Sequence, residues 1–423
     1  MNKSSSEQIK IRKIKQVFCK DSISDIPEYI HQVFKKSDLP SRINAGDRIG
    51  ITTGSRGISN IHVIVKQVIT ELRNINANPF IIAAMGSHGG ATSQGQKEIL
   101  TSYNITEREM GVPISSAMNT VKIGIVDNNI PVYFSEEALD ADGIIALNRV
   151  KLHTDFKSNL LESGMSKILV IGLGKRNGAE SIHSLGVYGL KKIIPQAVKL
   201  IIEKTPVIQG IGILENGYDQ TMEIKFCPPE DIVKTDAQLL KKCKDVFPSL
   251  PCDSIDVCIV QEMGKNISGT GLDTNVIGRL CINGEKEVGK PRINKLVVFD
   301  ITEQSHGNAL GVGLSDVTTR KLVNKINYQD TYANTITSTF LNRAKIPITA
   351  ETEKEAVDIA LKTCWQIDKK KIRFVVIKNT LDLESLYVSE SIWNDIKENR
   401  DIKPSGDWEE LSFTHDGKMK IKF

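Results

Sequence analysis

The first part of the chain alternates short apolar runs with a segment of helical periodicity. Apolar runs at residues 48–53 and 80–84 predict strands of a parallel sheet, because such strands are covered on both faces. The segment between them predicts a helix, since its apolar residues recur at three- and four-residue steps: Ile58, Ile61, Val65, Val68 and Leu72. Together they predict a βαβ unit, whose two strands run parallel with a right-handed crossover.

The same patterns extend this arrangement along the whole chain. A short amphipathic helix is predicted near residues 26–34, ahead of the first strand. Before residue 250, the further strands and helices are predicted at residues 121–126, 143–147, 187–202, 208–214 and 231–246. After residue 250, they are predicted at residues 255–261, 295–300, 316–326, 353–364 and 372–377.

Two prolines, Pro248 and Pro251, predict a boundary between two domains. We therefore expect an α/β fold made of two α/β domains, with largely parallel sheets and an active-site cleft between the domains. The N-terminal domain spans residues 1–250 and carries the candidate chemistry, and the tail 385–423 packs back on it. The C-terminal domain spans residues 251–384 and closes the cleft.

Composition and charge narrow the class of protein. The chain has 423 residues, 40% of them hydrophobic, which is enough for two or three cores. Its net charge of +4 and the absence of a basic block with interleaved aromatics argue against a nucleic-acid partner. No apolar run is long enough to span a membrane, and the seven scattered cysteines include no CxxC pair. We expect a cytoplasmic protein with reduced thiols and a small-molecule partner.

Polar residues follow the two strands of the predicted βαβ unit. Arg56 lies in the first loop and His88 in the second, and both loops leave the same edge of the sheet, so the two residues should be neighbours. Ser93 and Gln96 are spaced as a capping box that opens a helix. Gly86 and the following glycines, together with that helix start, could hold a phosphate or carboxylate. An ordinary glycine turn is the alternative.

A second polar group follows the apolar run at residues 143–147. It contains His153, Lys167 and His183. Histidine is the usual general base near neutral pH and the commonest metal ligand, although a single histidine is more often structural. A lysine at the mouth of a buried element can act as a nucleophile or covalent anchor, and a solvated lysine is the alternative. The glycine-rich residues 171–178 resemble a phosphate loop only loosely.

Two loops of the second half also follow predicted strands. Lys265 lies in the first loop and is a candidate contact for an anionic ligand. His306 lies in the second loop, and no role is assigned to it.

Five motifs in order resemble the nickel-dependent lactate racemase family and its 2-hydroxyacid racemase and epimerase relatives. Thr52-Thr-Gly-Ser-Arg56 is similar to the family's acid-x-Thr-Arg loop, and Ala84-Met-Gly-Ser-His88 is similar to its Gly-x-His loop. His153, Gly164-Met-Ser-Lys167 and His183 then follow the family's order of histidine, cofactor lysine and histidine. The resemblance covers most of the chain and is strongest from Ile51 to Gly186.

The resemblance implies an isomerase that inverts C2 of a 2-hydroxy acid by hydride removal and return. The implied cofactor is a nickel-pincer nucleotide, a pyridinium thioamide/thiocarboxylate mononucleotide tethered to Lys167, with His183 as the protein ligand to nickel. Cofactor-synthesis and insertion proteins are implied partners. The other implied roles are acid/base catalysis by His88 and His153, substrate binding by Arg56 and Lys265, and cofactor binding by Thr53, Ser55 and Gly86.

The chain also departs from this family. Thr53 stands where the family has an acidic residue, and the loop after residues 255–261 differs from that of the lactate enzymes. Lactate, malate and sugar acids therefore all stay open as substrates.

Two other functions stay open. A metal-dependent hydrolase or lyase would use two histidines with a nearby carboxylate and would give Lys167 no role. A non-enzymatic sugar-acid or nucleotide-binding protein would direct Lys167 to solvent.

Overall fold

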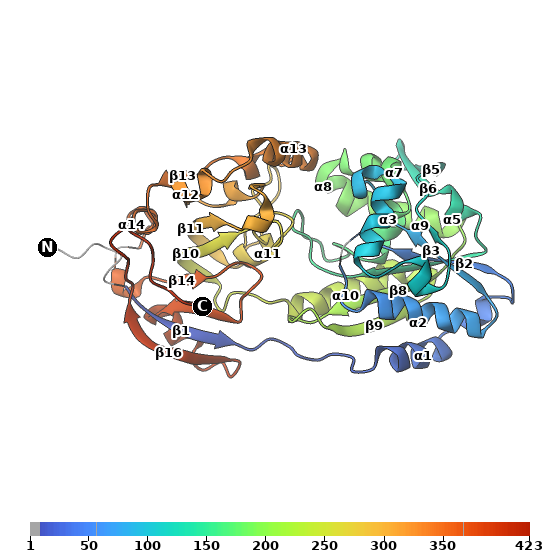
Figure 1. Cartoon of the computed structure of the whole chain (residues 1–423), viewed down its shortest axis with the longest axis horizontal. Helices are drawn as coiled ribbons and strands as arrows, with labels where there is room; N and C mark the ends of the chain where they lie inside the picture. Colours follow the sequence, from blue (N-terminus) through green and yellow to red (C-terminus); the bar gives the residue numbers. More distant parts are fainter. Residues whose placement is uncertain (1–8, 56, 367) are drawn as a thin grey trace. The chain divides into compact units, whose positions relative to one another are not determined.

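The computed structural model describes residues 9–55, 57–366 and 368–423, and the chain forms two compact units (Figure 1). Unit 1 contains the N-terminal stretch up to Phe18, the short segment Thr154–Phe156, and Pro248–Phe423. Unit 2 contains Cys19–His153 and Lys157–Phe247. Three separate segments of the chain therefore belong to unit 1, and the middle one begins directly after His153.

Unit 2 is built around a six-stranded sheet in the order β4-β3-β2-β7-β8-β9. The first five strands run parallel and β9 is antiparallel to β8. The bounds of these strands are β2 (Arg48–Thr53), β3 (Asn78–Ala83), β4 (Ile114–Ser115), β7 (Gly143–Arg149), β8 (Val207–Glu215) and β9 (Thr221–Cys227). The chain builds outward from β2 to β4 on one side, then from β7 to β9 on the other. Ligands of open parallel sheets bind at such a reversal, beyond the carboxyl ends of the strands.

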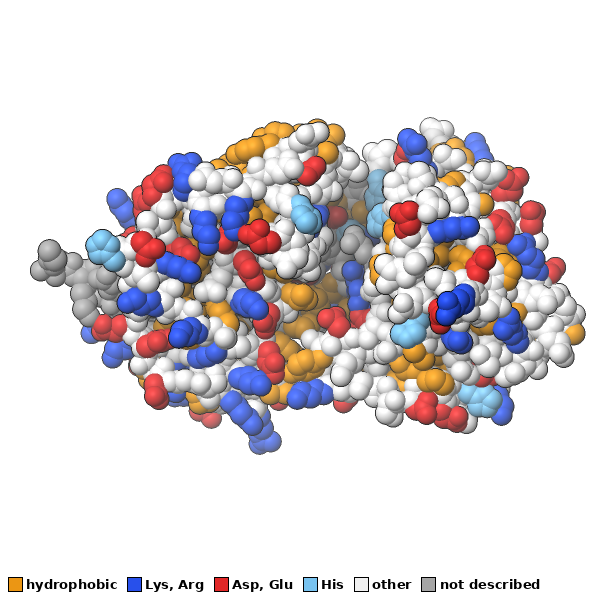
Figure 2. Space-filling model, in the orientation of Figure 1, with side chains coloured by type: hydrophobic (Ala, Val, Ile, Leu, Met, Phe, Trp, Pro, Cys, Tyr) orange, Lys and Arg blue, Asp and Glu red, His pale blue; other side chains and the backbone are white. Residues whose placement is uncertain are grey.

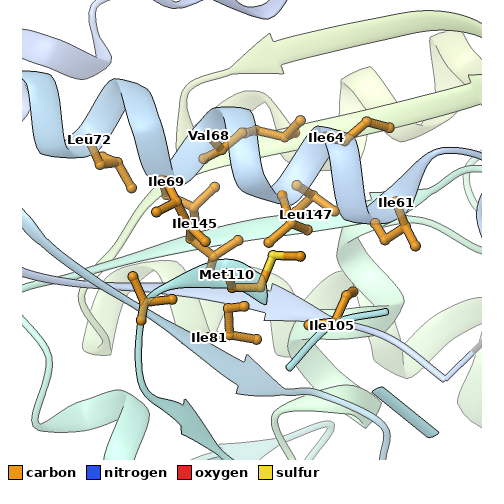
Figure 3. Packing of buried hydrophobic residues seen from close by; sticks show 14 of the residues in the cluster. Ile61, Ile64, Val68, Ile69, Leu72, Ile81, Ile105, Met110, Ile145 and Leu147 are labelled. Atoms are coloured by element: carbon orange, nitrogen blue, oxygen red, sulfur yellow. The ribbon is translucent and has the colours of Figure 1, made fainter. Parts of the chain in front are cut away.

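One face of this sheet is covered by α1 (Ile26–Lys36) and α2 (Ile61–Asn74), which lie side by side (Figure 1). The apolar stripe of α2 faces Ile81 of β3 and Ile145 and Leu147 of β7 (Figure 3). The predicted helical spacing of Ile61, Val65, Val68 and Leu72 is therefore the spacing of the residues that bury the sheet. Smaller helices complete this side: α3 (Ser93–Ser102) and α4 (Glu107–Met110).

The opposite face of the sheet holds the segment around Lys167. A Cβ added at Gly210 of β8 would lie 2.8 Å from Met165 Sδ. One added at Gly212 would lie 2.5 Å from a methyl group of Leu239. These two glycines therefore let two helices approach the sheet closely: α6 (Met165–Lys167) and α10 (Ile232–Val246). The remaining elements of unit 2 are β5 (Thr120–Val126), β6 (Ile130–Ser135), α5 (Glu136–Leu139), α7 (Lys175–His183), α8 (Gly186–Tyr188) and α9 (Ile194–Lys204).

Unit 1 contains an eight-stranded sheet in the order β13-β12-β11-β10-β14-β15-β1-β16. Its parallel strands are β10 (Ser254–Met263), β11 (Arg292–Ile301), β12 (Val317–Thr319), β13 (Ile348–Ala350) and β14 (Phe374–Ile377). The other strands are antiparallel: β15 (Ser385–Ser389), β1 (Lys10–Gln16) and β16 (Ile402–Glu410). The helices include α11 (Thr274–Ile277), α12 (Arg320–Val323), α13 (Tyr328–Ser338), α14 (Glu353–Thr363) and α15 (Glu390–Ile396). The mixed α/β class with mostly parallel sheets is thus confirmed.

The structure differs from the sequence prediction at the tail 385–423. We expected it to pack on the N-terminal domain, whereas β15 and β16 extend the sheet of unit 1. Strand β1, which the sequence analysis missed, lies between them and pairs with both. The unpaired backbone groups of an edge strand need a partner strand, and the tail supplies one from the other end of the chain.

Residues 316–326 also differ, because the predicted helix begins as strand β12. The hydroxyl of Thr318 donates to Val298 O at 2.9 Å, and the hydroxyl of Thr319 donates to Phe299 O at 2.6 Å. Both residues are β-branched and suit a pleated, half-buried position better than a helix. Helix α12 starts only after them, with Thr319 as its N-cap.

The short segment Thr154–Phe156 is fastened into unit 1 by Arg343, which is 1% exposed. Its Nη1 donates to Asp155 Oδ1 at 2.5 Å and its Nη2 donates to Thr154 O at 3.1 Å. The hydroxyl of Thr274 donates to the same carbonyl at 2.7 Å. A buried guanidinium paired with a carboxylate is costly to break, so this segment is firmly held.

The surface carries charges of both signs. Figure 2 shows Lys and Arg side chains interspersed with Asp and Glu over the visible face, in keeping with the nearly balanced net charge of +4. Within the described residues, no helix combines the length and the apolar character needed to cross a membrane.

We expect Leu72→Ala to destabilise unit 2 by about 2–5 kcal/mol, because Leu72 is fully buried and its truncation leaves a cavity. Ile125→Ala on β5, where the side chain is 49% exposed, should change stability by only about 0.5 kcal/mol. Urea denaturation of the full chain, with hydrogen exchange in α2 to report on unit 2, measures both. Equal effects of the two substitutions would contradict the packing described for α2.

Candidate active site

The loops after β2 and β3 meet at the carboxyl edge of the sheet in unit 2. Thr53 and Ala83 are paired in register at the ends of the two strands, so both loops start side by side. Ser55 Oγ and His88 Nδ1 are hydrogen-bonded, and the Tyr103 hydroxyl donates to Ser55 O at 2.8 Å. The structure thus brings Ser55 and His88 together. Arg56, predicted to bind substrate, lies outside the described residues.

The loop that carries His88 is held from below by Gln96 of α3, which is fully buried. Its Nε2 donates to Gly86 O at 3.0 Å and to His88 O at 3.4 Å. The predicted capping box of Ser93 and Gln96 is therefore wrong. The helix is capped instead by Thr92, whose hydroxyl accepts the Gly95 N–H at 3.1 Å, and Gln96 points inward.

Gly86 adopts a backbone conformation that requires glycine. Its φ is +60°, and an added Cβ would lie 3.1 Å from Ile171 Cγ2. Its N–H donates to Gly172 O at 3.2 Å. The His88 loop is therefore packed directly on the helical segment that follows Lys167.

His153 and Lys167 are in direct contact beyond the end of β7. Lys167 Nζ lies 2.7 Å from His153 Nε2. The His153 N–H donates to Glu162 Oε2 at 2.8 Å, and Lys157 Nζ donates to His153 O at 2.5 Å. The backbone of His153 is therefore fixed on both sides, and its ring faces the amine of the predicted anchor lysine.

The electrostatic surroundings keep His153 neutral. Burial, and then the nearby cations Lys167, Lys157 and Lys151, lower the pKa of His153 well below its usual 6.5. His183 contributes a smaller effect of the same sign, which puts it within electrostatic range of His153. His183 itself is an exposed residue at the end of α7.

The backbone at Lys167 is fixed by two residues from distant strands and helices. Asp236 of α10 is fully buried, and its carboxylate accepts the N–H of Met165 at 3.0 Å and that of Ser166 at 2.8 Å. Asn148, near the end of β7, donates to Gly164 O at 2.7 Å. A Cβ at Gly164 would lie 2.2 Å from Asp236 Oδ1, so this close approach needs glycine.

The glycine-rich residues 171–178 do not form a phosphate loop. They belong to a π-helical turn at Ile168–Gly172 and to α7. An added Cβ at Gly172 would lie 2.7 Å from Ala84 O, so this glycine allows the helix to pack against the His88 loop. Lys175 is fully buried, its Nζ donates to Ala83 O, and burial lowers its pKa to about 8.

Lys265, predicted to bind substrate, belongs to unit 1 and follows β10. Its N–H donates to Ser305 Oγ at 2.9 Å, and its Nζ donates to Gly269 O and, at 2.7 Å, to Asn334 Oδ1 of α13. The ammonium thus lies at the carboxyl edge of the unit 1 sheet, where a carbonyl and an amide oxygen accept from it.

Sequence reasoning missed Asp236 as a residue that shapes the site. A signal for it exists: it falls on the buried face of the helix between Ile232 and Leu239, where a lone carboxylate needs a buried partner. Glu162 also shapes the site. It is fully buried and accepts the N–H groups of His153 and Ser158.

The described residues offer two observations on cofactor binding. They contain no group of three or more His, Cys, Asp and Glu side chains able to hold a metal ion. Thr53 Oγ1, at the carboxyl end of β2, is buried and has no hydrogen-bond partner among the described residues. A buried hydroxyl without a partner at the mouth of a sheet is suited to a ligand that hydrogen-bonds to it.

Comparison with known proteins agrees with this architecture. Residues 4–191 match the family model of the lactate racemase N-terminal domain, which confirms the resemblance noted in the sequence. The fold is similar to that of the lactate racemase apoprotein from Thermoanaerobacterium thermosaccharolyticum, with a TM-score of 0.55 and 13% identity, over 86% of this chain and 93% of that chain. No curated protein matches the chain in sequence. Residues 4–191 are thus similar to the N-terminal domain of lactate racemases, and the fold of the chain is similar to that of a lactate racemase.

The buried carboxylate of Asp236 gives a pH-dependent prediction. Burial raises its pKa from 3.8 to about 6, so the stability it contributes is fully present below pH about 4 and is lost as the pH rises through about 6. A shift of about two units corresponds to about 3 kcal/mol. Asp236→Asn should remove this pH dependence of the free energy of unfolding, which urea denaturation at a series of pH values measures. Identical pH profiles for the two proteins would show that Asp236 titrates as an ordinary surface carboxyl.

Proposed function

We propose that the protein is a racemase or epimerase that inverts C2 of a 2-hydroxy acid. The observation that carries this proposal is the 2.7 Å contact between Lys167 and His153. It joins the residue assigned as cofactor anchor to one of the two residues assigned as acid/base catalysts. The bond between Ser55 and His88 supports the second catalytic position at the same sheet edge.

A nickel-pincer nucleotide fits the residues at this edge. Since the described residues contain no complete set of metal ligands, nickel would take His183 as its protein ligand and its other donors from the organic group. The anchor is Lys167. The buried hydroxyl of Thr53 has no partner among the described residues and suits a hydrogen bond to the nucleotide, which Ser55 and Gly86 would also contact. When bound, the group supplies the acceptor for the hydride of C2.

The histidines then move the hydroxyl proton of the substrate. His153 is neutral because its pKa is lowered by burial and nearby cations, so it is in the form that accepts a proton. Ser55 holds His88 through Nδ1, so we assign proton transfer to Nε2. Two enantiomers present their hydroxyls to opposite sides, and each needs a base within hydrogen-bond reach. Arg56 and Lys265 complete the proposal as ligands for the substrate carboxylate.

The other two functions have less support. A metal-dependent hydrolase or lyase needs a carboxylate close to the histidines, but Glu162, beside His153, is already engaged by two backbone N–H groups. The hypothesis of a non-enzymatic binding protein predicts that Lys167 points to solvent. The contact of Lys167 with His153 disfavours that hypothesis.

The setting of the protein is part of the proposal. Its cysteines are all free, in keeping with the reducing cytoplasm, where cofactor-synthesis and insertion proteins would load it. The substrate class is 2-hydroxy acids, with lactate, malate and sugar acids as the compounds to screen.

Attachment of the cofactor is tested on protein made together with the cofactor-synthesis enzymes. The full chain should show a mass increment and about one nickel per chain, because one group is attached through Lys167. Lys167→Ala should lose the mass increment, whereas Lys199→Ala, an exposed lysine of α9, should keep it. Intact mass and metal analysis measure both. An unmodified wild-type mass, from cells that demonstrably make the cofactor, would refute the proposal.

Catalysis by the histidines is tested on the loaded enzyme with a panel of 2-hydroxy acids. His88→Gln should lower the racemisation rate by about 10²–10⁴, the usual contribution of general acid–base catalysis. His62→Gln, an exposed histidine of α2, is the control and should leave the rate unchanged. Polarimetry or chiral chromatography measures the rate. A fully active His88→Gln enzyme would remove His88 from the mechanism.

A further inference from the structure

The contact between Lys167 and His153 has a defined direction. A lysine ammonium can only donate hydrogen bonds, so His153 Nε2 must accept and the ring carries its proton on Nδ1. The low pKa of His153 agrees, since it keeps Nε2 unprotonated. The nitrogen that would take a proton from substrate is therefore occupied by the amine of Lys167 at 2.7 Å.

The surroundings of the pair hold this arrangement in place. Glu162 accepts the N–H of His153, and Lys157 donates to its carbonyl oxygen. Lys151 and His183 add electrostatic effects that also disfavour a protonated ring. Asp236 fixes the backbone just before Lys167. The backbone is therefore held at His153 and just before Lys167.

We propose that the unmodified Lys167 masks His153, and that attachment of a group to Lys167 is the step that makes His153 available to substrate. This inference rests on the proposed function for the identity of the attached group. It adds an order of events: the protein is an inactive acid/base catalyst until its own lysine has been thioacylated.

The chemistry of attachment explains the change. A thiocarboxylate and the lysine ammonium combine with the loss of one water: a C–N bond forms, the C–O bond breaks, and the two hydrogens of the water come from the ammonium. The product is a thioamide. The nitrogen then has no charge and keeps one N–H in place of three, so its hold on His153 Nε2 is weakened.

The masking is tested on unloaded protein, from cells that do not make the cofactor. Nitrogen NMR of the seven labelled histidines, with His153 identified by His153→Gln, gives the pH at which His153 takes up its proton. In Lys167→Met this midpoint should rise by about one pH unit or more, because a charge-assisted hydrogen bond and a neighbouring cation are both lost. Lys199→Met, on α9, should leave it unchanged.

Two further variants make the test specific. Lys157→Met removes a cation that donates to His153 O, whereas the amine of Lys167 lies against Nε2, so it should raise the midpoint less than Lys167→Met does. Lys167→Arg keeps a donor at the same position and should keep the midpoint low. The seven histidine signals also report whether each variant is folded.

The outcomes separate this inference from the proposed function. A midpoint in Lys167→Met equal to that of the wild type would overturn the masking, even if the loaded enzyme is a racemase. A raised midpoint in a protein that never gains mass or nickel would support the masking contact and refute the proposed function.

Discussion

The candidate site depends on the parallel pairing of β2 with both β3 and β7. Because β2 is the strand from which the chain builds outward in two directions, the loops after three strands open at one edge of one sheet. This single constraint places Ser55 beside His88 and puts the chain after β7, with His153, at the same edge. The geometry of the site follows from the strand order before any side chain is considered.

The second requirement is a rigid support for Lys167, and the protein builds it from a buried carboxylate. Asp236 accepts two backbone N–H groups at the start of α6, while the glycines of β8 let that short helix lie against the sheet. Burial raises the pKa of Asp236, so the protein tolerates a destabilising charge in order to fix the backbone there. A loss of stability that serves to hold a backbone segment in position is typical of functional sites.

Local sequence patterns predicted the elements whose structure depends on neighbouring residues. They failed for features that depend on contacts between segments far apart in the sequence. The helical spacing of Ile61 to Leu72 and the apolar run of β3 predicted the βαβ unit, and with it the meeting of two loops. Asp236 lies 69 residues beyond Lys167, so only the folded chain reveals their relation. Strand β1 reads as a basic segment, KIRKIKQ, and becomes a strand because β15 and β16 flank it.

Because the segment Thr154–Phe156 belongs to unit 1, it affects whether either half of this protein can fold alone. A fragment ending at Phe247 would keep His153 but lose Arg343, leaving Asp155 without the guanidinium that binds it. A fragment beginning at Pro248 would lose β1, and so would leave β15 and β16 without the strand between them. Unit 1 is therefore assembled from segments on both sides of residue 247, and a cut at that point would divide it.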